Sequence, residues 1–221
     1  MGIPAHQPTY VNVRSNSMAA VFGWMAAGLG ITAMVSMMLV SSPALFALVT
    51  GSKMIIYGAF ILEFGLVVAI SGFAARMGAA TAAPLFFLYS ALNGITLSGI
   101  FLIYTHQSIS SAFVTTAGTF AITSGYGIIT KRDLTSVGSF CFMGLVGIVI
   151  ASLVNIFLHS GMLQFIVSGL GLIIFIGLIA YDSQKYKGAE GAAAISGALS
   201  LYLDFLNLFL IMLRLFGNSR D

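Results

Sequence analysis

The stretch Thr135–Leu158, TSVGSFCFMGLVGIVIASLVNIFL, contains no charged side chain. About 20 consecutive apolar residues are enough to cross the hydrocarbon core of a bilayer as an α-helix. The stretch reaches that length, and it is bounded by the charged triplet Lys131-Arg132-Asp133 on one side and by His159 on the other. The sequence therefore predicts a membrane-spanning helix over residues 135–158.

The composition of the whole chain extends this prediction to the rest of the protein. Hydrophobic residues make up 59% of the 221 positions and charged residues only 7%, whereas an average soluble domain carries about 25% charged residues. So few charges cannot cover a water-soluble globule, and most of the surface must face lipid. The net charge of +3 is small and its basic residues are scattered, which argues against nucleic-acid binding. The single cysteine, Cys141, excludes an internal disulfide and a cysteine metal site.

Six further apolar runs have the same character, and together they predict an all-α, polytopic membrane protein with seven transmembrane helices. The expected spans are 18–40, 54–75, 81–103, 111–130, 135–158, 163–182 and 192–214. Residues 1–17 are expected to form a polar tail, residues 18–217 the transmembrane domain and residues 218–221 a short second tail. The first connection is expected to be a loop, between Ser41-Ser42-Pro43 and Gly51-Ser52-Lys53.

The positions of Lys and Arg predict how the chain lies in the membrane. One side receives Arg14, Arg76, Lys131, Arg132, Lys185 and Lys187, and the other receives Lys53, Arg214 and Arg220. Because basic residues concentrate on the cytoplasmic side of a membrane, the amino terminus is expected in the cytoplasm. A re-entrant last segment would bring Arg214 and Arg220 back to the same side, and the sequence leaves that alternative open.

The glycines within the spans are expected to let neighbouring helices approach closely, because packing drives helix association in lipid. The examples are Gly65, Gly94, Gly99, Gly144, Gly147, Gly169 and Gly171.

Three acids fall within the spans or at their edges, namely Glu63, Asp182 and Asp204. An ionisable residue at the bilayer centre costs about 2.5–3.5 kcal/mol on insertion scales, so it needs a partner or water. Two carboxylates close together in a low dielectric cannot both ionise cheaply and can share a proton. Their oxygens suit Ca²⁺, and a nearby cation, Arg76, would lock the deprotonated pair. The alternative is structural: each acid pairs with a polar neighbour, and Arg76 and Asp182 are ordinary interface charges.

Other polar residues indicate where an ion pathway would run. Asn207 lies three residues after Asp204 and is therefore its neighbour on the same helix face. Asn93 belongs to a stripe of polar residues on the third span. We expect Glu63, Asn93 and Asn207 to line the pathway, whereas His106 and His159 fall in loops and are not expected to bind metal.

Three motifs resemble the Bax inhibitor-1 family: Asn93-Gly94-Ile95-Thr96-Leu97-Ser98, Ala180-Tyr181-Asp182-Ser183-Gln184-Lys185, and the closing segment 201–217 around Asp204. The resemblance covers essentially the whole chain and implies a seven-helix fold with the seventh helix central in the bundle. It implies a pH-sensitive Ca²⁺ leak in which Asp182 and Asp204 share a proton and hold Ca²⁺ as a permeant or bound ion. Arg76, matched by its place at the end of the second span, would be the latch on the cytoplasmic side. No other cofactor is implied, and the short carboxyl-terminal end favours a bacterial, inner-membrane member.

Two other functions compete with the leak. Some bacterial relatives are described as modulators of a membrane-bound AAA protease, and residues 1–17 would then be a contact for such a partner. The two aspartates also resemble those of intramembrane aspartyl proteases. Those enzymes use Gly-x-Gly-Asp at the second acid, whereas this chain has Leu201-Tyr202-Leu203-Asp204, so the sequence disfavours an enzyme.

Overall fold

The computed structural model describes residues 18–218, except for the side chains of residues 74 and 75. The predicted tail over residues 1–17 lies outside the described residues, and only Asn218 of the predicted second tail lies within them.

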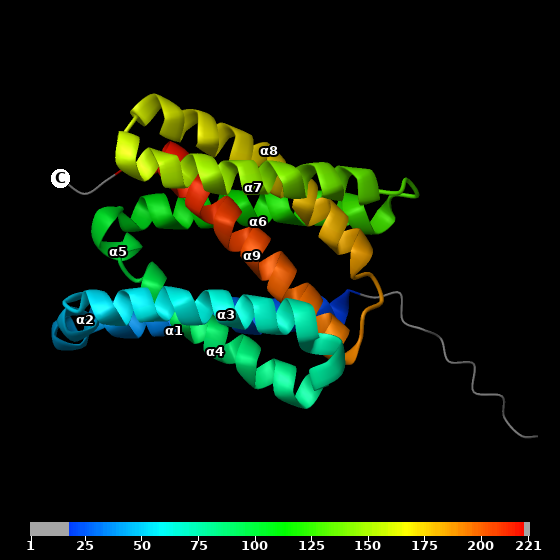
Figure 1. Cartoon of the computed structure of the whole chain (residues 1–221), viewed down its shortest axis with the longest axis horizontal. Coiled ribbons are helices and arrows are strands. Elements are labelled where there is room, and N and C mark those ends of the chain that lie inside the picture. The colour runs from blue at the N-terminus through cyan, green and yellow to red at the C-terminus, as the bar shows by residue number, and fades with distance from the viewer. Residues whose placement is uncertain (1–17, 219–221) are drawn as a thin grey trace, which may run out of the picture.

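Seven long helices cross the molecule, and they confirm the predicted all-α bundle of seven spans (Figure 1). They are α1 (Ala19–Ser41), α3 (Lys53–Met77), α4 (Ala79–Leu97), α6 (His106–Ile129), α7 (Thr135–Leu158), α8 (Gly161–Lys185) and α9 (Gly191–Phe216). The short helix α5 (Ile100–Ile103) continues the third span beyond a break at Ser98 and Gly99. Each span lies within a few residues of its predicted position because length and apolar composition suffice to locate it.

The connection between the first two spans differs from the prediction. It contains the helix α2 (Pro43–Thr50) rather than a loop throughout. Pro43 is the first helical residue, where its fixed φ and missing N–H suit a helix start. Four of the residues that follow, Ala44, Leu45, Ala47 and Leu48, are good helix formers. The turn residues on either side of this segment mark the ends of a short helix, and the sequence reasoning had assigned the whole stretch to a loop.

The last helix is the centre of the bundle. In the most apolar 18-residue stretch of helix α9, 61% of the residues are buried inside the bundle. The corresponding share is 33% or less in every other span. It contacts α1, α3 and α4 on one side and α6 and α8 on the other, and Figure 1 shows it running obliquely between these two groups. Helix α7 is the least buried span, because only 6% of its most apolar 18-residue stretch is buried and it packs mainly on α8. The central seventh helix implied by the family resemblance is therefore confirmed.

Hydrogen bonds between buried polar groups join the central helix to α1 and α4. The hydroxyls of Thr32 and Tyr202 lie 2.5 Å apart, and Thr32 also reaches the carbonyl oxygen of Ser90 at 2.8 Å. Ser36 donates to the carbonyl oxygen of Gly94 at 2.7 Å. A buried polar group without a partner is costly in a membrane protein, so these contacts fix how the three helices pack.

The expected role of the glycines holds for only some of them. A Cβ added at Gly94, Gly144 or Gly171 would lie within 3 Å of a side chain or carbonyl of a neighbouring helix. A Cβ added at Gly65, Gly99, Gly147 or Gly169 would meet nothing within 4 Å. A glycine therefore allows close helix packing only where it faces a neighbouring helix, and the presence of glycine in the sequence does not show which face it lies on.

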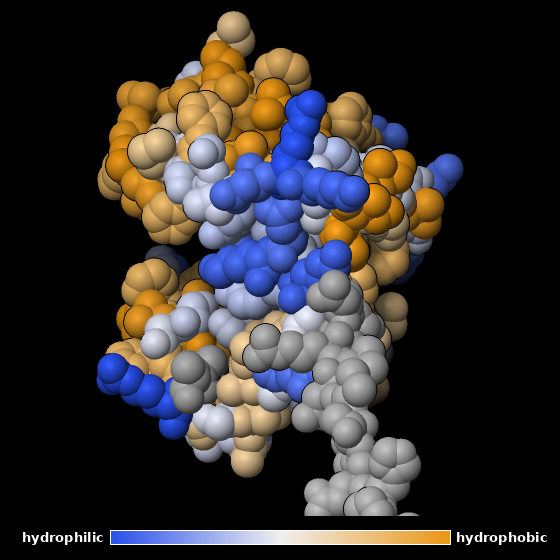
Figure 2. Space-filling view, turned by 90° about the vertical axis from the view of Figure 1, so that its right-hand side faces the viewer, coloured by the Kyte–Doolittle hydropathy of each residue, from blue (hydrophilic) through white to orange (hydrophobic). Residues whose placement is uncertain are grey.

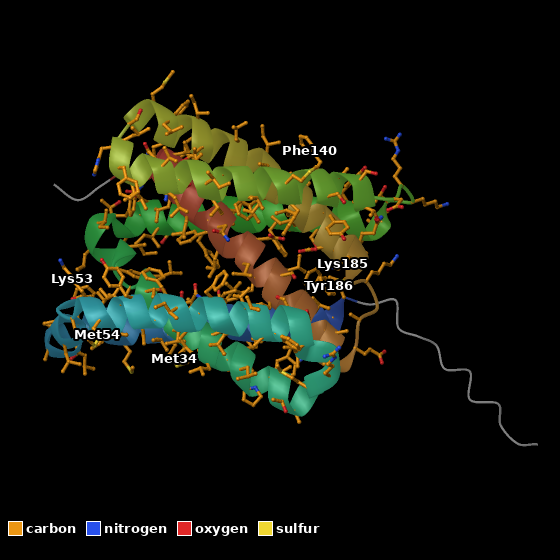
Figure 3. All side chains as sticks on the ribbon, in the orientation of Figure 1. Met34, Lys53, Met54, Phe140, Lys185 and Tyr186 are labelled. Carbon is orange, nitrogen blue, oxygen red and sulfur yellow. The ribbon has the colours of Figure 1, made fainter. Side chains whose placement is uncertain are left out.

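The two ends of the bundle differ in charge. Arg76 at the end of α3, Lys131 and Arg132 between α6 and α7, and Lys185 and Lys187 after Asp182 all belong to one end, which we call the basic end. Figure 2 looks onto this end and shows hydrophilic residues gathered across the middle of the face. Among the described residues, Lys53 and Arg214 lie at the opposite end (Figures 1 and 3).

Helix α9 crosses the whole bundle. It is 26 residues long, which corresponds to about 39 Å at 1.5 Å per residue. Beyond its end, the backbone N–H of Asn218 donates to Ser108 Oγ at 2.9 Å, and Thr105 N–H donates to the Asn218 carbonyl oxygen at 3.2 Å. These contacts tie its end to the start of α6, away from the basic end, so the re-entrant alternative is wrong.

Candidate functional site

A cavity of about 660 Å³ opens between α7, α8 and α9, toward the basic end of the bundle, and Val67 of α3 completes its lining. We call it the acidic cavity because Asp182 of α8 and Asp204 of α9 both line it. Its other polar lining residues are Ser139, Tyr181, Lys185, Ser200 and Asn207. The two aspartates are 22 positions apart along the chain, and the helical hairpin formed by α8 and α9 brings both into the lining of one cavity.

Asp204 is the more deeply buried of the two acids. It is 5% exposed, and its Oδ2 atom has no hydrogen-bond partner among the described residues. One turn further on, Asn207 Nδ2 donates to the Leu203 carbonyl oxygen at 2.8 Å and therefore does not serve the carboxylate. A buried carboxylate oxygen without a protein partner is stable only if it is protonated, hydrated or bound to a cation. The acidic cavity supplies the space for each of these.

Asp182 has a cationic neighbour that the sequence reasoning did not include in the site. Lys185 lies three residues later on α8, lines the same cavity, and is labelled in Figure 3 beside Tyr186. Its ammonium nitrogen lies 4.9 Å from the ring centroid of Tyr186 and 5.7 Å from that of Tyr181. The three-residue spacing between Asp182 and Lys185 was the available signal, because such pairs share a helix face. The sequence prediction uses Lys185 for the orientation of the chain and does not assign it to the site.

The end of α8 that carries Asp182 is fixed to the connection between α6 and α7. Gln184 accepts a hydrogen bond from Leu134 N at 2.9 Å and donates one to the Arg132 carbonyl oxygen at 2.8 Å. One residue before it, Ser183 lies 2.7 Å from Ser124 of α6, hydroxyl to hydroxyl. These bonds hold the helix immediately after Asp182, so its carboxylate has a defined place in the lining of the cavity.

Glu63 and Asn93 lie apart from the acidic cavity. Glu63 of α3 is partly buried and accepts a hydrogen bond from Thr96 of α4 at 3.0 Å. Asn93 is 8% exposed, and its Nδ2 atom has no partner within the described part of the chain. Neither residue lines the cavity, whereas Asn207 does. A pathway that includes all three residues stays a prediction.

Arg76 is exposed in the last turn of α3, at the basic end. It does not line the acidic cavity and forms no ion pair with Asp182 or Asp204 in this conformation. The predicted latch therefore requires a different conformation, in which α3 and α8 lie closer together at this end. That role stays a prediction.

The acidic residues do not form a resident metal centre by themselves. No group of three or more His, Cys, Asp and Glu side chains in the described part of the chain could hold a metal ion. Ca²⁺ takes six to eight oxygen ligands in proteins, and two carboxylates supply too few. The predicted Ca²⁺ contact at Asp182 and Asp204 is therefore compatible only with an ion that keeps most of its water.

Comparison with known proteins places the chain among bacterial membrane proteins. Residues 14–221 match the sequence family described as inhibitor of apoptosis-promoting Bax1. The chain is 46% identical to the inner membrane protein YbhL of Escherichia coli, with 92% of each chain covered. It is 43% identical to an uncharacterised protein of Borreliella burgdorferi (95% and 94% covered) and 39% identical to one of Deinococcus radiodurans (97% and 95% covered).

Proposed function

The chain belongs to the Bax inhibitor-1 family, and from that premise we propose that it mediates a pH-sensitive Ca²⁺ leak across a membrane. In this proposal Asp182 and Asp204 share a proton, and Arg76 closes the basic end when both carboxylates are ionised. Ca²⁺ passes the pair as a hydrated ion and is the transported species, not a cofactor.

The observation that carries the proposal is the acidic cavity itself. It places a buried carboxylate oxygen, for which residues 18–218 offer no hydrogen-bond partner, in the same space as a second carboxylate. A structural acid would be expected to have its oxygens satisfied by protein donors. An acid that exchanges a proton or a cation needs a carboxylate oxygen that is free of protein donors and lies beside a cavity, and Asp204 meets both conditions among the described residues.

The proposed location is the inner membrane of a bacterium, with the basic end in the cytoplasm. The name of the Escherichia coli relative supports the first part. Among the described residues, five basic side chains lie at the basic end and two at the other, which supports the second part. Helix α1 begins at the basic end, so the amino terminus would be cytoplasmic.

The direct test is Ca²⁺ release from liposomes that contain the purified full chain, measured with an entrapped fluorescent indicator across pH 6 to 8. We expect release above that of protein-free liposomes, and a rate that changes with pH. Release equal to that of protein-free liposomes at every pH would reject the leak. It would favour the alternative function, a non-conducting regulator of a membrane-bound AAA protease, which predicts co-purification of that protease and no flux.

Arg76 and Lys185, two of the five described basic residues at the basic end, give a prediction that separates the latch from a general effect of charge. The latch closes by attraction to the doubly ionised pair, so Arg76→Gln should keep the leak open at pH 8. A coupling of 1–3 kcal/mol corresponds to about 5- to 150-fold, and we expect about a tenfold rise at pH 8 with little change at pH 6. Lys185→Gln is the comparison, measured by the same release assay. If Lys185→Gln and not Arg76→Gln abolishes closure, the latch is Lys185, which already lines the cavity.

The paired aspartates also suit activation of water, as in an intramembrane protease. Incubation of the purified chain with a helical transmembrane peptide checks this directly, and we expect no cleavage. Cleavage that disappears in Asp204→Ala would contradict the proposal that the chain is not an enzyme.

A further inference from the structure

A second polar cavity lies at the end of the bundle opposite the basic end. It has a volume of about 360 Å³ and is lined by Ser152, Asn155 and Ile156 of α7, Gln164 and Val167 of α8, and Arg214 of α9. We call it the Arg214 cavity. It is distinct from the acidic cavity, with which it shares no lining residue.

The polar groups of the Arg214 cavity are rich in donors. The Arg214 guanidinium, the Gln164 amide and the Ser152 hydroxyl make no side-chain hydrogen bond to any described residue. Asn155 uses its Oδ1 atom to accept from Ser160 N at 3.0 Å, which leaves its NH₂ group as a donor. No carboxylate of the described residues 18–218 lines the cavity. One positive charge surrounded by donors, with no acidic partner in that part of the chain, is the composition of an anion site.

The position of the cavity at the ends of three spanning helices indicates which anion it would bind. Arg214 lies in the last turn of α9, Asn155 in the last turn of α7 and Gln164 in the first turn of α8. All three ends reach the level where a spanning helix meets the lipid headgroups, at which cationic side chains meet phosphates. The apolar wall continues outward through Ile156, which is 62% exposed, so an acyl chain could lie along α7 below a bound headgroup.

We propose that the Arg214 cavity binds the phosphate of a membrane phospholipid, with Arg214 as the charge and Gln164 and the Asn155 NH₂ as additional donors. The phosphate would link α9, the central helix, to α7, the least buried span, which otherwise packs mainly on α8. This proposal is independent of ion conduction, since it concerns only the opposite end of the bundle.

The test is lipid retention by the purified full chain, measured by native mass spectrometry after exchange into detergent with added phosphatidylglycerol. We expect retention of one phosphatidylglycerol, and no retention of a diacylglycerol with the same chains, because it lacks the phosphate. Arg214→Gln should weaken retention about tenfold, the factor that corresponds to about 1.4 kcal/mol. Arg214→Lys, which keeps the charge, should restore part of it.

Lys53→Gln is the matched control, because Lys53 is a basic residue at the same end but does not line the cavity. It should retain phosphatidylglycerol as the unchanged chain does. Competition by millimolar glycerol 3-phosphate distinguishes the source of the anion: displacement of the lipid means that the cavity also takes a free phosphate, and no displacement means that it requires the lipid. Equal retention by Arg214→Gln and the unchanged chain, or equal retention of diacylglycerol and phosphatidylglycerol, would overturn the proposal.

Discussion

Replacement of Asp204 by asparagine is expected to remove the pH dependence of Ca²⁺ release from liposomes. The side chain keeps its shape and loses its ability to ionise, so the acidic cavity can hold at most one carboxylate charge, that of Asp182. Without a second carboxylate there is no shared proton to release as the pH rises. The rate in Asp204→Asn should therefore vary by less than about twofold between pH 6 and pH 8.

The sign of the effect in the unchanged chain follows from the charges at the cavity. At low pH the pair retains one proton and carries a single negative charge. At high pH the proton leaves, the charge doubles, and the attraction to the Arg76 latch grows. The leak should therefore fall as the pH rises, by about tenfold if the added attraction is roughly 1.4 kcal/mol. The other charged or titratable side chains that line the cavity are Lys185 and Tyr181, both from α8.

Asp133→Asn is the matched control for this experiment. Asp133 is an exposed aspartate between α6 and α7 at the same end, and it does not line the cavity. Hydrogen bonds from Thr135 hold the pKa of Asp133 below its usual value, so its carboxylate stays charged across the range of the assay. Asp133→Asn should keep the full pH response. A pH response in Asp204→Asn as large as that of the unchanged chain would exclude the aspartate pair as the sensor.

The sequence predicts the spans of this protein better than it predicts the site. Apolar length determines whether a segment such as Thr135–Leu158 crosses a membrane, and this property is local to the segment. Helix α2 was missed because turn residues at Ser42 and Gly51 indicate a connection without showing whether a short helix fits inside it. The local sequence pattern therefore locates the long spans correctly and fails at the short helix α2.

The convergence of Asp182 and Asp204 was predictable in part. The family resemblance implies that the two aspartates lie together, but which faces of α8 and α9 meet depends on packing that leaves no local signal. For that reason Glu63 and Asn93 were grouped with Asn207 although they lie apart from the cavity that Asn207 lines. Lys185 was missed despite a local signal, its three-residue spacing from Asp182. The sequence shows which polar residues are candidates for a site, but only the packing of the helices shows which of them lie together.

Two glycines on one helix also show that residue type does not reveal which positions contact a neighbouring helix. Gly125 and Gly127 lie two positions apart on α6, and nothing in their residue type distinguishes them. A Cβ added at Gly125 would meet nothing within 4 Å, whereas one added at Gly127 would collide with the backbone carbonyl oxygen of Ala180 on α8 and lie 3.0 Å from its Cα. Helices α6 and α8 therefore touch at backbone distance where Gly127 meets Ala180, which lies two residues before Asp182.

This contact predicts that Gly127→Ala lowers the stability of the bundle while Gly125→Ala does not. Both changes favour the helix by up to about 1 kcal/mol. Only the first inserts a methyl group against backbone atoms, which cannot rotate away, and overpacking of this kind costs about 1–3 kcal/mol or more. For a chain of this size 1 kcal/mol shifts the unfolding midpoint by about 2–4 °C. We expect Gly127→Ala to unfold several degrees lower in detergent, by circular dichroism, and Gly125→Ala to unfold at the same temperature or slightly higher.

A second measurement connects this contact to the site. To accommodate the methyl group α8 must move away from α6, which would break the 2.7 Å contact between Ser124 and Ser183 and displace the adjacent Asp182. The pH response of Ca²⁺ release should then change in Gly127→Ala even at temperatures where the chain is folded. Equal unfolding midpoints for the two variants would show that α6 and α8 separate without cost, and that the position of Asp182 does not depend on this contact.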